Sequence, residues 1–116
     1  MASQFSKKGQ KSNSRKYARE ALSADPSMSK AYTLIGNLYM SSFDDCKQLK
    51  SKVDDRAIYL IAYDMYQKAG NTRGMKSAEA QFPSISEMFE LDLKEGQSIT
   101  VGCWINQSTT LRRRSE

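Results

Sequence analysis

The chain has 116 residues, 39% of them hydrophobic and 27% charged, with a formal net charge of +5, as is typical of one small globular domain. It contains no histidine, which excludes imidazole general bases, Ser-His-Asp and Cys-His nucleophile systems, and zinc sites with histidine ligands. No apolar run approaches the roughly 18 residues of a membrane span, and residues 1–10 lack the apolar stretch of a signal peptide, so we expect a soluble chain without a membrane span.

Residues 1–14 are mostly Ser, Lys, Gln and Gly with one Phe, a composition that predicts a disordered basic segment or a frayed helix. The cations that precede the first acid, Glu20, are Lys7, Lys8, Lys11, Arg15, Lys16 and Arg19. Such a cluster can hold nucleic acid, because neighbouring cations add their potentials and release counterions when they bind phosphates. Interleaved aromatic residues are few, however, and we favour a solvated flanking segment.

Two helices are predicted next. Apolar residues recur at helical spacing from Arg15 to Ala24, and Asp25-Pro26 then ends the helix, because proline disfavours helical geometry in the residue before it. The second helix begins near Ser27 or Ser29, where serine oxygens can cap free backbone amides, and continues to about Ser41.

Residues 42–55 are mostly polar and are predicted to form an inserted loop or a helix extension. Its two acid pairs, Asp44-Asp45 and Asp54-Asp55, could bind calcium, but the EF-hand spacing is absent and we interpret them as a solvated turn. A third helix is predicted from Arg56 to Ala69 by a wide apolar stripe, and Gly70-Asn71 ends it as a left-handed cap.

Residues 72–81 are predicted as a fourth helix, weakened by Gly74 and ended by Phe82-Pro83, with a short capped turn over residues 84–89. Hydrophobic residues then alternate with a period of two from Ile99 to Ile105, and Asn106-Gln107 separates them from the Thr-rich residues 108–111. This pattern predicts a terminal β-hairpin within residues 93–116.

Cys46 and Cys103 are too few for a disulfide framework, and we interpret them as ordinary thiols rather than as a redox pair, with Cys103 on the apolar side of a strand. Trp104 lies on the opposite side of that strand, where it covers the last helix or is exposed for a partner; we favour packing.

The second and third helices carry two patterns of a known repeat. The first is Tyr32, then Ile35-Gly36, then Tyr39, and the second is Ala62, Tyr66 and Ala69. Both resemble the tetratricopeptide repeat, a helix-turn-helix unit of 34 residues that stacks into a superhelix. The resemblance covers residues 18–70, with about 14 extra residues between the two helices and with Gly74 in place of the closing proline.

The resemblance implies a concave groove that binds peptides, lined here by residues of the second helix: Lys30, Thr33, Asn37, Met40 and Ser41. Asn37 stands where peptide-clamping members use an asparagine to hold the ligand backbone or its C-terminal carboxylate. Thr33 stands where their clamp has lysine, which makes a full carboxylate clamp doubtful. The alternative is that this face is solvated or contacts another part of a longer protein.

We therefore expect a mostly α fold: repeat-like antiparallel helices over residues 15–92, with the insertion at 42–55 and the C-terminal hairpin. Because repeat units bury their faces against each other, we expect the C-terminal part of a longer repeat protein, which can dimerise through an open apolar face. The predicted function is a non-enzymatic scaffold or adaptor that binds a protein or peptide and needs no cofactor or metal. A nucleic-acid-associated module using the basic N-terminus is the alternative.

Overall fold

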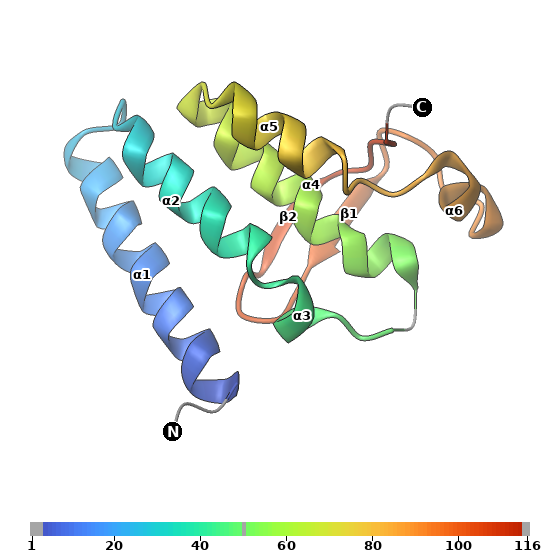
Figure 1. Cartoon of the computed structure of the whole chain (residues 1–116), viewed down its shortest axis with the longest axis horizontal. Coiled ribbons are helices and arrows are strands. Elements are labelled where there is room, and N and C mark those ends of the chain that lie inside the picture. The colour runs from blue at the N-terminus through green and yellow to red at the C-terminus, as the bar shows by residue number, and fades with distance from the viewer. Residues whose placement is uncertain (1–3, 50, 115–116) are drawn as a thin grey trace.

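A computed structural model describes residues 4–49 and 51–114, and this part of the chain is mostly helical, as predicted. Its elements are the helices α1 (Gln4–Ala24), α2 (Ser29–Met40), α3 (Phe43–Cys46), α4 (Lys52–Ala69), α5 (Thr72–Glu79) and α6 (Ile85–Glu90), followed by the strands β1 (Ser98–Val101) and β2 (Gln107–Thr110). Helices α1, α2, α4 and α5 lie side by side, and the hairpin packs against α4 (Figure 1). The prediction of a C-terminal antiparallel β-hairpin is confirmed.

Helix α1 ends at Ala24, before Asp25-Pro26 as predicted, but it begins at Gln4. Residues 4–14, predicted as disordered or as frayed helix, are therefore helical; residues 1–3 lie outside the described part. Lys11 anchors this part of α1 to the rest of the fold, because its Nζ atom donates to the carbonyl oxygen of Ser41 and pairs with the Asp45 carboxylate, both at 2.9 Å. These partners are 30 and 34 positions away in the sequence, so no local sequence pattern could predict them.

Helices α2 and α4 form close to the predicted positions. The residue before α2 is Met28, whose side chain makes no capping hydrogen bond, so the predicted serine cap is wrong; Ser27 instead bonds to the Asp25 carboxylate. Helix α4 begins at Lys52, capped by Ser51, so the insertion consists of α3, a short link and the first turn of α4. Gly70 ends α4 in the predicted left-handed conformation, with φ 68°.

Helix α5 is shorter than predicted, and α6 forms the predicted short capped turn. The Ser84 side chain accepts a hydrogen bond from the Glu87 amide, and the Glu87 carboxylate accepts one from the Ser84 amide. This reciprocal capping box satisfies two backbone donors, which explains why a helix of only six residues is stable here.

The hairpin differs from the prediction in its turn. Its strands pair antiparallel, with Ser98 opposite Thr110 and Val101 opposite Gln107, so the connection is the five residues 102–106. The amides of Ile105 and Asn106 both donate to the Gly102 carbonyl oxygen. The predicted two-residue turn at Asn106-Gln107 is therefore wrong.

Cys103 lies in this turn, exposed and with φ 57°, rather than on the apolar side of a strand. It forms a disulfide with Cys46 of α3, which corrects the interpretation of the two cysteines as ordinary thiols. The pairing joins residues 57 positions apart, and nothing in the local sequence around either cysteine indicates it.

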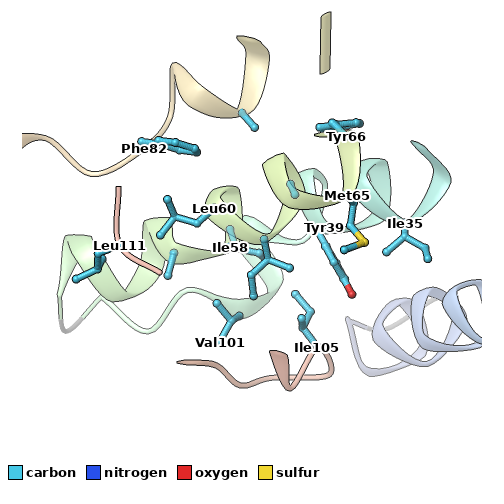
Figure 2. Close-up of a cluster of buried hydrophobic side chains, with 14 of the residues drawn as sticks. Ile35, Tyr39, Ile58, Leu60, Met65, Tyr66, Phe82, Val101, Ile105 and Leu111 are labelled. Carbon is cyan, nitrogen blue, oxygen red and sulfur yellow. The ribbon is translucent and has the colours of Figure 1, made fainter. Parts of the chain in front are cut away.

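One hydrophobic core joins the helices to the hairpin. Figure 2 shows Val101 and Ile105 lying below the side chains of α4, with Tyr39 of α2 beside them. Tyr39 is fully buried, and Ile105 and Leu111 are each 1% exposed. Burying side chains of this size contributes roughly 1.5–3 kcal/mol each, so the hairpin is part of the folded core.

Candidate functional site

The five predicted site residues lie along or just beyond α2, but they differ in exposure. Lys30 and Asn37 are exposed, and Thr33 is half-buried. Met40 is half-buried and packs against the core, which leaves little of it for a ligand. Ser41 follows the last residue of α2, where its hydroxyl donates to the Leu38 carbonyl and its own carbonyl accepts from Lys11.

Asn37 is oriented by α4. The Tyr66 hydroxyl donates to the Asn37 Oδ1 atom at 2.6 Å. Burial raises the pKa of Tyr66, so the hydroxyl keeps the proton that it donates. Because Oδ1 is occupied, the amide nitrogen of Asn37 points its two hydrogens elsewhere, and within the described residues it has no partner.

Thr33 lies one turn before Asn37 and faces the start of α5. The Asn71 amide nitrogen donates to Thr33 Oγ1 at 3.4 Å, a long hydrogen bond, while Asn71 Oδ1 caps α5 by accepting from the Gly74 amide. Thr33 and Asn37 therefore belong to one polar strip where α2, α4 and α5 meet.

The helices meet there around one aromatic ring. A Cβ atom on Gly36 of α2 would lie 2.8 Å from Tyr66 Cε1, and one on Gly74 of α5 would lie 2.5 Å from Tyr66 Cδ1. Both distances are too short for a side chain, so two glycines from different helices make room for the ring. Gly36 and Gly74 therefore share a close-packing role, although Gly74 weakened the prediction of its helix.

A second cluster, which the sequence analysis missed, joins α1 to the hairpin. Arg15 is buried, and its guanidinium group donates to the carbonyl oxygens of Ile105 at 2.7 Å and Trp104 at 3.1 Å, and to the Tyr39 hydroxyl at 3.1 Å. It also lies 4.9 Å from the centre of the Trp104 ring. The sequence offered one indication of this burial: Lys11, Arg15, Ala18 and Leu22 share one face of a helix. The interpretation of Lys11 and Arg15 as part of a solvated basic segment does not take it into account.

Trp104 packs, as favoured, but not against the last helix. Its ring lies 5.7 Å from that of Tyr39, and its Nε1 atom donates to Ser42 Oγ. It therefore covers the junction of α1, α2 and the hairpin.

A pocket of about 290 Å³ lies beside the disulfide. It is lined by Cys46, Gln48, Ser51, Asp54, Asp55, Ile58, Thr100, Val101, Gly102 and Cys103. Asp55 is held in place because its carboxylate accepts from the amides of Gln48 and Leu49. No group of three or more potential metal ligands occurs in the described residues.

Comparison of the chain with protein-family models, with curated proteins and with solved structures finds no match. Among the described helices, none combines the length and the apolar character needed to cross a bilayer.

Proposed function

We propose that this chain is a helical-repeat interaction module, similar to the tetratricopeptide repeat, that binds a peptide or protein segment along α2. The observation that carries the proposal is the orientation of Asn37. Tyr66 occupies its oxygen, so both amide hydrogens of this exposed residue are available to donate to a ligand carbonyl or carboxylate.

The packing of the helices supports the repeat interpretation. Successive helices are neighbours, with α1 on α2, α2 on α4, and α4 on α5, as in a stacked array. Gly36 of α2 and Gly74 of α5 both make room for the Tyr66 ring of α4, so a small residue packs against a large one at the α2–α4 and α4–α5 interfaces.

The binding surface is smaller than the resemblance implies. Lys30, Thr33 and Asn37 offer polar groups at the surface, whereas Met40 packs against the core and the hydroxyl of the exposed Ser41 donates to the Leu38 carbonyl at the end of α2. We propose that Asn37 and Lys30 hold ligand oxygens and that Thr33 positions the strip through Asn71.

The test is a substitution that changes the ligand-facing atoms of Asn37 but keeps its contact with Tyr66. Asn37→Asp retains an oxygen acceptor for the Tyr66 hydroxyl and replaces the two donors with a carboxylate oxygen. A partner is first captured from source cells with the wild-type chain and then purified. Combined with Lys30→Met, the Asn37→Asp substitution is expected to weaken the affinity for this partner by about tenfold or more. The matched control is Gln67→Glu with Lys76→Met, which makes the same chemical changes at exposed positions outside α2.

The capture is run at low and high salt with nuclease present. A partner that survives both conditions, and loses affinity only with the α2 variant, supports the proposal. Binding of nucleic acid that salt abolishes would support the basic-arm alternative instead. That alternative has fewer cations available than the sequence suggested, because Lys11 and Arg15 are engaged inside the fold. Equal loss in both variants, or only self-association of the chain, contradicts the α2 site.

A further inference from the structure

We propose that the Cys46–Cys103 disulfide is a site of thiol–disulfide exchange, attacked at Cys103 through the acidic pocket beside it, and that its reduction releases the 102–106 turn. The two cysteines come from α3 and from the hairpin tip. Cys103 is exposed and Cys46 is half-buried, and both line the pocket of about 290 Å³. An external thiol therefore has access to the Cys103 sulfur.

The exchange proceeds in two balanced steps. A thiolate attacks Cys103 Sγ, so a new sulfur–sulfur bond forms while the Cys46–Cys103 bond breaks, and the electron pair leaves on Cys46 Sγ, which takes a proton from water. A second thiol then attacks the mixed disulfide and frees Cys103. The protein disulfide gains two electrons, and the two thiols are oxidised to one disulfide.

The charge of the pocket defines the class of thiol. Asp54 and Asp55 line it, and among the described residues that line it none is a lysine or arginine. The Asp54 carboxylate has no partner within the described residues, so its charge acts on whatever enters. Negative charges that line the pocket repel an anionic thiol, so the site favours neutral or cationic thiols, or an oxidoreductase with a basic rim, over anionic thiols.

Reduction acts on the turn because of its backbone. Cys103 has φ 57°, a conformation that residues other than glycine adopt at an energetic cost. The disulfide holds Cys103 in place, and without it the residue can relax to an extended conformation. The hydrogen bonds from Ile105 and Asn106 to Gly102 then open, while Arg15 and the burial of Ile105 keep the rest of the hairpin docked.

The first experiment measures how fast three thiols reduce the oxidised chain: cysteamine, 2-mercaptoethanol and 2-mercaptoethanesulfonate, cationic, neutral and anionic respectively. Rates are compared per thiolate, by alkylation and mass spectrometry. We expect cysteamine to react several-fold faster than the sulfonate at low salt, and Asp54→Asn to reduce that ratio. Asp92→Asn is the matched control, because it removes the same charge outside the pocket at a left-handed position that asparagine tolerates.

The route through the pocket is wrong if the three thiols react alike, or if Asp54→Asn and Asp92→Asn change the ratio equally. The whole proposal is wrong if an alkylating reagent modifies both cysteines of the chain purified without reductant before any thiol is added, because the disulfide is then absent.

The second experiment compares backbone amide exchange in the oxidised and reduced chains. We expect exchange at Ile105 and Asn106 to accelerate about tenfold or more after reduction, while amides inside α4 keep their protection. The Cys46→Ser/Cys103→Ser variant should reproduce the reduced pattern. Unchanged exchange in the turn, or loss of protection throughout α4, would overturn a local release.

Discussion

Arg15 places a guanidinium group where α1, α2 and the hairpin meet. Its hydrogen bonds satisfy the carbonyl oxygens of Trp104 and Ile105, two residues of a turn that strand pairing leaves without partners. A buried carbonyl that loses its donor costs the full desolvation of the group, so this side chain affects stability more than its position in a basic segment suggests.

We expect Arg15→Met, which keeps the apolar stem, to lower the free energy of unfolding by about 3 kcal/mol. Urea denaturation followed by Trp104 fluorescence measures it, because Trp104 is the single tryptophan of the chain. Arg19→Met, at an exposed position on the same helix, should change the free energy by no more than about 0.5 kcal/mol. Equal effects of the two substitutions would contradict the proposed role of Arg15.

Replacing glycine by alanine is expected to have opposite effects on stability at a packed and at an open helical position. Gly36→Ala places a Cβ atom 2.8 Å from the Tyr66 ring and should destabilise the chain by about 1–3 kcal/mol, despite the better helix propensity of alanine. Gly9→Ala is the control, because a Cβ atom at that helical position meets no atom within 4 Å outside its own helix backbone and chain neighbours. This substitution should raise the free energy of unfolding by up to about 1 kcal/mol. Thermal unfolding of both variants measures these changes in stability. A stabilising Gly36→Ala substitution would contradict the close packing of Gly36 against Tyr66.

At the scale of elements, α6 shows how a short helix depends on its cap. Burial raises the pKa of Glu87, but the hydrogen bond from the Ser84 amide and the charge of Arg56 lower it, and the net pKa lies below its ordinary value of 4.5. A carboxyl group whose pKa is lowered by folding stabilises the folded state above its unfolded pKa, and that contribution is lost as the pH falls through the folded value.

We therefore expect wild type to be more stable than Glu87→Gln by about 0.5 kcal/mol at neutral pH, and the difference to disappear in acid below the pKa of Glu87. Urea midpoints of the two chains across this pH range measure the difference. Glu90→Gln, on the same helix and exposed, should show no comparable dependence. A difference that persists unchanged in acid would show that the Glu87 charge is not responsible.

At the scale of the whole molecule, the disulfide closes a loop that contains α4, α5, α6 and β1. Its two cysteines are 57 positions apart, and a cross-link over such a loop stabilises a folded chain by about 4 kcal/mol through the entropy of the unfolded state.

We expect the Cys46→Ser/Cys103→Ser variant to lose about that much unfolding free energy relative to the oxidised chain. Far-ultraviolet circular dichroism and Trp104 fluorescence should report one coincident transition in the oxidised chain, because helices and hairpin share a core. Adding reductant to the serine variant should have no effect. Two separate transitions in the oxidised chain would show that the hairpin unfolds independently of the helices.

Much of the local helical structure could be predicted from the sequence, although the cap of α2 and the hairpin turn could not. Helical spacing, Asp25-Pro26, Gly70 and a serine cap at Ser84 or Ser86 predicted α2, the ends of α1 and α4, and α6, because each depends on atoms within a few residues. It also placed Asn37 on the exposed side of α2.

The tertiary structure alone decided the rest. The start of α1, the roles of Arg15 and Trp104, and the disulfide depend on partners 30 to 90 positions away. The orientation of Asn37 likewise requires Tyr66, 29 positions along the chain. Contacts at such separations leave no periodic pattern, because each is selected by the packing of the whole core rather than by its neighbours in sequence.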